Sequence, residues 1–258
     1  GMNAATPLSA HQRDLSTLYR ELASGRRTNN TTSPATIQIG QRLQNRAGST
    51  SAANSNITFS LSRSQTVTGY MQQGYDVLAR VKELSVQAQD GTLTDADRQA
   101  IDTEAQELMK SLDQIHDTAT FNGQKIMQGQ TQDVATGPDG QSTTAPSGDL
   151  ARETLGLENV DLSTQEGAAE AMEAVDNAQQ VISEQSAEVG AHQRQLQDQF
   201  DANLQAEAHL RESSSNNMDT DFALATMNAA TAGVRSDIAL AVQAQANNLQ
   251  AHLMAGMF

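Results

Sequence analysis

The sequence predicts a mainly α-helical protein: a long antiparallel helical rod, or coiled-coil bundle, with a small β-hairpin-containing region at mid-sequence. Aromatic residues make up only 3% of the chain and Trp is absent, which is too few for a compact globule, where aromatic rings supply much of the core. Apolar residues instead recur three and four positions apart, as in helices that pack along narrow stripes. Pro is absent from Ala35 to Gly137, so nothing there interrupts helices of many turns.

The first half of the chain predicts two helical segments separated by a polar stretch. A short apolar stripe is formed by Leu8, Leu15, Leu18 and Leu22. It ends at "SGRRTNNTTSP" (residues 24–34), which has no periodicity. A long helix is then expected over residues 35–89, with its clearest stripe at Val77, Val81, Leu84 and Ala88.

The segment "DGTLT" (residues 90–94) predicts a tight turn between two long helices. We expect Gly91 to end the first helix in a left-handed conformation. Thr94 is a good N-cap for the second, and Asp97 completes a capping box. The second helix has a heptad stripe of Ile101, Ala105, Leu108, Leu112, Ile115 and Ala119. Because the turn is short, the two helices should lie antiparallel.

The second half predicts a small β-region followed by two more helices. Residues 120–162 are rich in Gly, Ser, Thr and Gln, and Pro138-Asp139-Gly140 favours a hairpin or an exposed loop. Ser163 or Thr164 should cap a further long helix, which follows the β-region. The stripe of this helix is Val175, Ile182, Val189 and Leu196. That pattern fades at a polar break, residues 212–221. The last helix carries Ile238, Val242, Ala246, Leu249, Leu253 and Met257 on one stripe.

These patterns predict three parts. Residues 1–35 and 219–258 are expected to form the two pieces of an inner core domain. Residues 36–218 are expected to form the helical rod domain, with the β/loop region at 120–162 inside it.

Charge and composition exclude several classes of function. The net charge is −15 and only three lysines occur, whereas nucleic-acid binding needs clustered Lys and Arg. No Cys is present, which excludes disulfides, thiol nucleophiles and Cys-ligated zinc. The most apolar window, residues 238–258, contains six Gln, Asn or His residues, which a bilayer would penalise. We therefore expect an assembly helix and no membrane span.

No catalytic, cofactor-binding or metal-binding residues are predicted. The five histidines, His11, His116, His192, His209 and His252, are scattered, and no two lie four apart as a zinc-protease helix requires. The pair Asp219 and Asp221 lacks the further ligands and the Gly of a calcium loop, so Thr220 or Asp221 is expected to cap the last helix.

Four blocks of the sequence, in order, resemble bacterial flagellin. They are "LSTLYRELASGRRTNN" (residues 15–30), "ARVKELSVQAQDGTLTDADRQAIDTEAQEL" (79–108), "TATFNGQKIMQG" (118–129), and "MDTDFALATM" (218–227) with "AVQAQANNLQAHLMAGMF" (241–258). The resemblance covers most of the chain apart from residues 131–161. The large outer domains of the family would occupy that short gap, so it implies a minimal flagellin. Two departures from the family are expected to matter. The N-terminus starts roughly a dozen residues late for the family, and "NNTTSPATIQIG" (29–40) replaces a family segment that usually carries acidic residues.

The resemblance implies a secreted, non-enzymatic subunit that self-assembles into the extracellular flagellar filament for motility. Implied partners are other copies of the chain, the flagellar export chaperone, and the junction and cap proteins. The self-assembly residues would lie on the terminal stripes: Leu15, Leu18, Leu22, Ile238, Val242, Leu249, Leu253 and Met257.

The resemblance also implies a recognition surface for the vertebrate innate receptor that detects flagellin, formed by Arg80, Leu84 and Glu104. Arg80 and Leu84 are four apart on one helix, and Glu104 should lie at their level on the antiparallel neighbour. Such a patch would be exploited by a host and not evolved for it. The alternative interpretation is a solvated helix face with weak ion pairs.

Two alternative functions stay open at this point. One is a hook–filament junction protein of the same superfamily, although Phe121-Asn122-Gly123 and "AQANNLQ" favour the filament protein. The other is an extracellular binding protein or hydrolase on a helical scaffold, which no Gly-x-Ser-x-Gly motif, thiol or histidine cluster supports.

Overall fold

A computed structural model of the chain describes residues 13, 16–20, 22–24, 34–219, 226–235, 237–238, 240–241 and 245. The chain divides into two compact units. The central unit is Gly48–Glu207, and the terminal unit combines Gly1–Ala47 with Ala208–Phe258. The domain boundaries expected near residues 35 and 218 stay a sequence-based prediction.

Long helices dominate the described residues, as predicted. Helix α2 spans Pro34–Ala88 and helix α5 spans Gln165–Met218. The elements between them are α3 (Asp95–Thr118), β1 (Thr120–Phe121), β2 (Gln124–Lys125), β3 (Gln132–Ala135), β4 (Ser142–Ala145) and α4 (Arg152–Leu155). Helix α5 continues through most of the predicted polar break. Inside that stretch Ser214 is buried, and its Oγ donates to the carbonyl oxygen of Gly40 at 3.0 Å.

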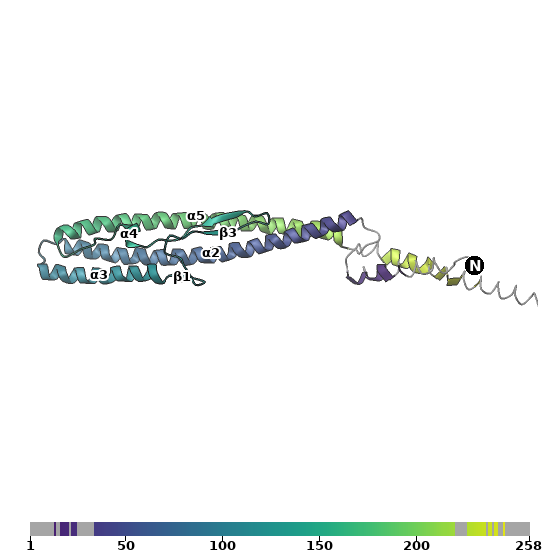
Figure 1. Ribbon diagram of the computed structural model, residues 1–258, viewed down its shortest axis with the longest axis horizontal. Helices are drawn as coiled ribbons and strands as arrows, with labels where there is room; N and C mark the ends of the chain where they lie inside the picture. The colour runs from purple at the N-terminus through teal and green to yellow at the C-terminus, as the bar shows by residue number, and fades with distance from the viewer. Residues whose placement is uncertain are drawn as a thin grey trace, which may run out of the picture. The chain divides into compact units, whose positions relative to one another are not determined.

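In the central unit, α2, α3 and α5 lie side by side, with α2 in the middle (Figure 1). Helix α5 runs antiparallel to α2, because the residue number on α5 rises as the number on α2 falls along their contacts. These contacts are Gln89 with Ala168, Lys82 with Asp176, and Met71 with Ser186. Helix α3 is antiparallel to α2 as well, since only a short turn joins them.

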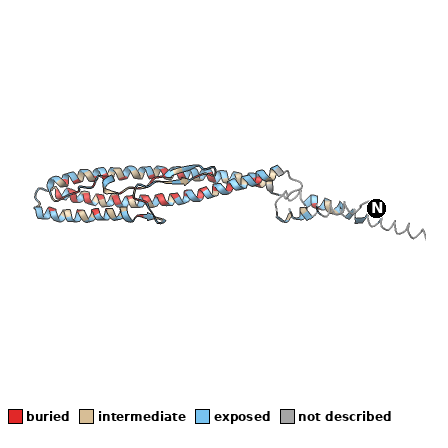
Figure 2. Ribbon diagram, viewed as in Figure 1, coloured by how far each residue is buried: buried red, intermediate tan, exposed pale blue. Residues whose placement is uncertain are grey.

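Buried positions form a stripe along each long helix (Figure 2). On α2 every step of the stripe is three or four residues: Thr50, Ala53, Ile57, Ser60, Ser64, Val67, Met71, Gly74, Leu78, Val81, Ser85 and Ala88. On α5 the predicted Val175, Ile182, Val189 and Leu196 are all buried. This spacing is the heptad pattern of coiled coils, and it confirms the predicted packing.

The stripe changes in chemistry along the central unit. One part, which we call the apolar section, is a continuous hydrophobic core running from Val67 on α2 to Val189 on α5. The other part, the polar section, has a buried layer in which polar side chains outnumber large apolar ones. Its buried polar residues are Asn54, Ser60, Arg63, Ser64, Thr136, His192 and Asn203.

The mid-sequence region forms two small antiparallel hairpins, β1–β2 and β3–β4. Asn122 and Gly123 link β1 to β2 with φ of 49° and 76°, as a two-residue turn with positive φ at both positions requires. In the second hairpin Gln132 pairs with Ala145 and Ala135 with Ser142. Its loop contains Pro138-Asp139-Gly140, which confirms the predicted hairpin.

The second hairpin lies against α2 and α5 and is held by side-chain hydrogen bonds to its backbone. Nδ2 of Asn203 on α5 donates to the carbonyl oxygen of Thr136 at 2.8 Å. Nη1 of Arg63 on α2 donates to the carbonyl oxygen of Pro146 at 3.0 Å. These bonds place the β-region over the polar section, where the buried donors need acceptors.

Candidate assembly and recognition surfaces

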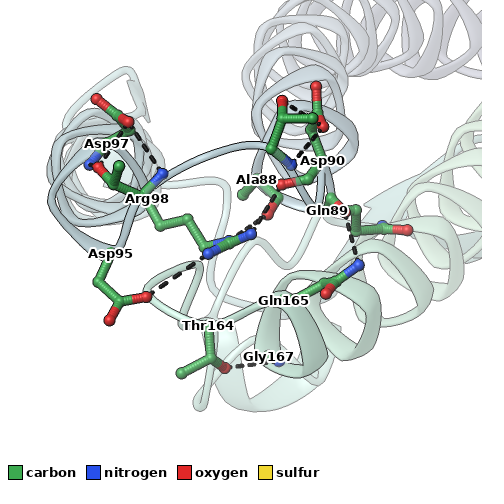
Figure 3. A network of polar contacts seen from close by, with 11 residues as sticks. Ala88, Gln89, Asp90, Asp95, Asp97, Arg98, Thr164, Gln165 and Gly167 are labelled. Carbon is green, nitrogen blue, oxygen red and sulfur yellow. Dashed lines mark hydrogen bonds and ion pairs between the residues drawn. The ribbon is translucent and has the colours of Figure 1, made fainter.

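The turn between α2 and α3 is fixed by side chains and not by a left-handed glycine (Figure 3). The expectation for Gly91 is wrong, since its φ is not positive. The Asp90 carboxylate instead accepts from the backbone N–H of Thr92 at 2.9 Å and from the Thr92 hydroxyl at 2.8 Å. These bonds stabilise the charged form, and the backbone bond has the larger effect, so the pKa of Asp90 is lowered.

The N-terminus of α3 carries the predicted capping box. The Thr94 hydroxyl accepts from the backbone N–H of Asp97 at 3.3 Å, and the Asp97 carboxylate accepts from the backbone N–H of Thr94 at 3.0 Å. The pKa of Asp97 is lowered, first by its bond from the Thr94 hydroxyl and then by the backbone bond.

Arg98 completes this end of the central unit, and the sequence did not single it out. Although charged, it is buried, and its guanidinium donates to the carbonyl oxygens of Ala88 at 2.9 Å and Asp90 at 2.7 Å (Figure 3). The Ala88 carbonyl is the last of α2, and no further helical turn can satisfy it. The Asp90 carbonyl lies in the turn and also accepts from the backbone N–H of Leu93 at 3.2 Å. Arg98 therefore works as a C-cap supplied by the next helix.

The same end also receives the start of α5. Thr164, one of the two predicted caps, accepts from the backbone N–H of Gly167 at 3.0 Å. Nε2 of Gln165 donates to the carbonyl oxygen of Gln89 at 2.9 Å. The three helices thus meet in one polar network around the turn (Figure 3).

The predicted recognition residues are only partly on the surface. Arg80 forms an ion pair with Glu83 on the same helix at 2.7 Å and another with Glu104 on α3 at 3.0 Å. Glu104 therefore lies at the level of Arg80, as predicted. The pKa of Arg80 is raised, first by its hydrogen bond to Glu83 and then by Glu104. Leu84 does not share this exposed face. It is 1% exposed and belongs to the hydrophobic core, next to the stripe residue Ser85, which is buried as well.

Of the predicted self-assembly residues, three lie within the described residues. Leu18 and Leu22 are half-buried, and Ile238 is 57% exposed. Ile238 continues an exposed apolar stripe with Met227 and Val234, seven and four residues apart on one helix face. Leu15, Val242, Leu249, Leu253 and Met257 lie outside the described residues.

The described residues contain no group of three or more His, Asp or Glu side chains placed to hold a metal ion. Within the same residues, no helix is long and apolar enough to cross a membrane. Asp219 accepts a hydrogen bond from Ser215, one turn earlier. The cap expected at Thr220 or Asp221 lies outside the described residues.

A groove beside α2 was not predicted from the sequence. It has a volume of about 280 Å³ and is lined by Asn56, Phe59, Ser60, Arg63, Gln132, Asp133, Val134 and Ala135. The burial of Ser60, which lines the groove, could have been predicted from the spacing of Ile57, Val67 and Met71. Steps of three and four residues between these apolar residues place Ser60 and Ser64 on the buried side of the helix. Because serine is polar, these two positions are not recognised as part of an apolar stripe.

Solved structures of flagellar proteins share this architecture. The crystal structure of Bacillus cereus flagellin is similar with a TM-score of 0.53 and 20% identity, over 58% of this chain and 88% of that one. A putative flagellar hook-associated protein from Vibrio parahaemolyticus is similar with a TM-score of 0.61 and 16% identity, over 71% and 98%. At these identities the likeness shows the fold, that of flagellar structural proteins.

Sequence comparisons give the family. Residues 1–132 match the family model described as the bacterial flagellin N-terminal helical region. The chain belongs to the bacterial flagellin family, whose members are structural subunits of the extracellular flagellar filament.

Two relatives show how far the similarity extends. The flagellar filament core protein flaB2 of Brachyspira hyodysenteriae is 27% identical over 96% of this chain and 94% of its own length. The B-type flagellin of Pseudomonas aeruginosa strain PAO1 is 34% identical over 50% of this chain, and that match spans only 26% of its own length. The chain is thus similar end to end to a short filament protein and similar only in part to a long one.

Proposed function

We propose that this chain is a structural subunit that polymerises into the flagellar filament, with residues 1–35 and 219–258 forming the inner contacts between subunits. The single observation that carries the proposal is the similarity to a filament core protein over 96% of the chain. Residues 36–218 form the outer helical part, and the short β-region replaces the larger outer domains of longer relatives.

The exposed apolar stripe at Met227, Val234 and Ile238 supports the assembly role. Isolated helices with one apolar face are marginal in water, and burial of that face against another copy supplies the missing stabilisation. The hook-associated protein is similar in fold alone, so no observation favours a junction role for this chain.

The test is elongation of sheared filament seeds by purified subunit, followed by electron microscopy. Ile238→Asp places a charge on the stripe and should block elongation, since burial of an unpaired carboxylate is costly. Asn228→Asp adds the same charge at an exposed polar position and is the matched control. Both variants should keep the circular dichroism of the wild-type monomer. Normal elongation by Ile238→Asp would remove the stripe from the contact between subunits.

The finer partners follow from this role. A secreted filament protein with aggregation-prone terminal helices needs an export chaperone that covers them, and its filament needs junction and cap proteins at its two ends. Binding of the chaperone to wild type but not to a variant lacking residues 219–258 would support that assignment.

We also propose that Arg80 and Glu104 form the centre of the surface recognised by the vertebrate innate flagellin receptor. Leu84 enters only as the buried residue that holds α2 at this level. Arg80→Ala should weaken receptor binding by at least about tenfold, as for an arginine at an interface centre. Lys110→Ala removes a comparable exposed ion pair, with Glu107 at 2.6 Å, and should leave binding unchanged. Equal affinities for wild type and Arg80→Ala would eliminate Arg80 from the surface.

A further inference from the structure

The groove between α2 and β3 has a buried cation at its floor. Arg63 is only 4% exposed, yet it belongs to the lining of the groove. Its Nη1 donates to the carbonyl oxygen of Pro146 at 3.0 Å and its Nη2 to that of Gln130 at 3.4 Å. A guanidinium has five N–H donors, so these two neutral acceptors leave most of its hydrogen-bonding capacity for another group.

No carboxylate of the described residues forms an ion pair with Arg63, whereas Arg80, Arg98 and Arg152 each form at least one. Burial lowers the pKa of Arg63, which shows the cost of holding this charge away from water. Buried charges in proteins are normally paired. An unpaired buried arginine beside an open groove therefore indicates a counter-ion that arrives from outside the chain.

The groove walls are suited to a side chain entering from outside. Ser60 is 2% exposed and its hydroxyl has no hydrogen-bond partner, so it offers a second polar group next to Arg63. Phe59 is 48% exposed at the edge, and its ring lies 5.0 Å from that of Phe121. Asp133 is the one carboxylate in the lining, and it already accepts from the Thr144 hydroxyl at 2.8 Å.

We propose that this groove receives an Asp or Glu side chain from a second copy of the chain in the filament. The chain has 31 acidic and 16 basic residues, so a neighbouring copy has an excess of carboxylates to offer to a buried cation. Arginine pairs with a carboxylate through two parallel hydrogen bonds, and an exposed Phe beside it supplies apolar contact area. Arg63, which has no carboxylate partner in the free subunit, thus forms an ion pair once two copies pack together in the filament. The inference rests on the proposed role as a filament subunit.

The first experiment measures the critical concentration for elongating sheared seeds. Arg63→Met removes the cation at similar length and should raise this concentration by at least about tenfold, as expected when one partner of a buried pair is truncated. Asp133→Asn removes the competing negative charge from the lining and should lower it. The opposite signs make the pair diagnostic, and Asp133 is exposed, so its variant folds even if Arg63→Met does not.

The second experiment uses the absence of native cysteine. Asn56→Cys, at the groove edge, is labelled with a benzophenone maleimide in assembled filaments and irradiated. Adducts should join two chains and map to a peptide containing Asp or Glu, and they should disappear with Arg63→Met. Adducts within one chain, or an unchanged or raised critical concentration for Asp133→Asn, would overturn the inference. Failure of the wild type itself to elongate seeds would instead count against the proposed function.

Discussion

The apolar and polar sections share helices α2 and α5 and the same heptad spacing on α2, yet they are stabilised differently, and α3 packs only into the apolar section. In the apolar section Leu78, Leu112 and Ile182 are at most 2% exposed and pack into one hydrophobic cluster. In the polar section the equivalent stripe positions of α2 are Ser60 and Ser64, and α5 contributes His192 and Asn203. Small or polar side chains there supply much less apolar area.

The polar section therefore depends on hydrogen bonds that the hairpin β3–β4 completes. Asn203 and Arg63 both donate to backbone carbonyls of the hairpin region. Other groups in the layer have no protein partner: both side-chain atoms of Asn54, both ring nitrogens of His192, and the Ser60 and Ser64 hydroxyls. The contrast shows that heptad spacing determines which face of a helix is buried. The chemistry of the side chains determines how much apolar area that face buries and how many of its polar groups find partners.

The largest expected effect is loss of a core side chain in the apolar section. Leu78→Ala should lower the free energy of unfolding by about 3–5 kcal/mol, since a fully enclosed leucine leaves a cavity that cannot collapse. Ile57→Ala, in the polar section, should cost only about 2 kcal/mol, because small neighbours and the nearby groove give room for relaxation or water. Urea unfolding followed by circular dichroism measures both. Equal costs would break the distinction between the sections.

Arg98→Met should have the next largest effect. It removes the donor that satisfies the last carbonyl of α2, that of Ala88, and leaving a buried acceptor unpaired costs about 1–3 kcal/mol. Arg80→Ala is the exposed counterpart and should leave the melting temperature nearly unchanged, since exposed ion pairs contribute little. Similar melting temperatures for wild type and Arg98→Met would mean that the turn does not need the arginine cap.

Acid should weaken the polar section through His192. Burial lowers the pKa of His192, and the positive charge of Arg63 on α2 lowers it further, while Glu188 on α5 opposes the shift. The unfolded chain therefore binds this proton more readily than the folded one. The stability that neutral His192 contributes is fully present above the pKa of the unfolded state, about 6.5. It is lost as the pH falls from there toward the lower pKa of the folded state.

Urea unfolding at pH 7.5 and at pH 5.5 tests this prediction. His192→Leu should lose less stability across that interval than wild type. His209→Leu, at an exposed position, should behave as wild type. The aspartates with lowered pKa, Asp90, Asp97 and Asp161, lose their contribution only at more acidic pH, below about 4. An equal loss in wild type and His192→Leu would contradict the role of His192.

The smallest effect is expected at Ser64, which is fully buried with an unpartnered hydroxyl. Ser64→Ala should leave stability unchanged or raise it by up to about 1 kcal/mol, because it removes a polar group that burial penalises. Differential scanning calorimetry resolves such a change. A clear loss of stability would show that Ser64 is hydrogen-bonded in solution, as by a buried water.

Much of the fold was predictable because its elements carry local signals. Heptad leucines and valines marked α3 and α5, and Thr94 with Asp97 marked the start of α3. The first part of α2 was harder, since its buried stripe includes Thr50, Ser60 and Ser64, which no hydropathy pattern places inside. The position of the turn between α2 and α3 was predicted, but the side chain that caps α2 was not. That side chain is Arg98, which lies on α3, ten residues after the end of α2 at Ala88.

The candidate surfaces were predictable only where they depend on spacing. The pairing of Arg80 with Glu104 followed from a short turn between antiparallel helices. The burial of Leu84 also followed from spacing, because Leu84 belongs to the apolar stripe with Val81 and Ala88. Placing it on the exposed face of Arg80 conflicted with that stripe. The groove needed the hairpin to lie against α2, a contact between residues that are far apart in the sequence.

The unbroken spacing of the α2 stripe has a consequence for how the helices wind. Steps of three and four residues average 3.5 per turn, whereas a straight α-helix has about 3.6, a drift of about 20° per heptad. From Thr50 to Ala88 the stripe covers more than five heptads, so a straight helix would carry it roughly 100° around its axis. Helix α2 must therefore coil left-handedly with its neighbours to keep the stripe in contact. Insertions or deletions of seven residues keep this phase, those of three or four residues change the local winding, and those of one or two residues rotate the buried stripe away from its neighbours.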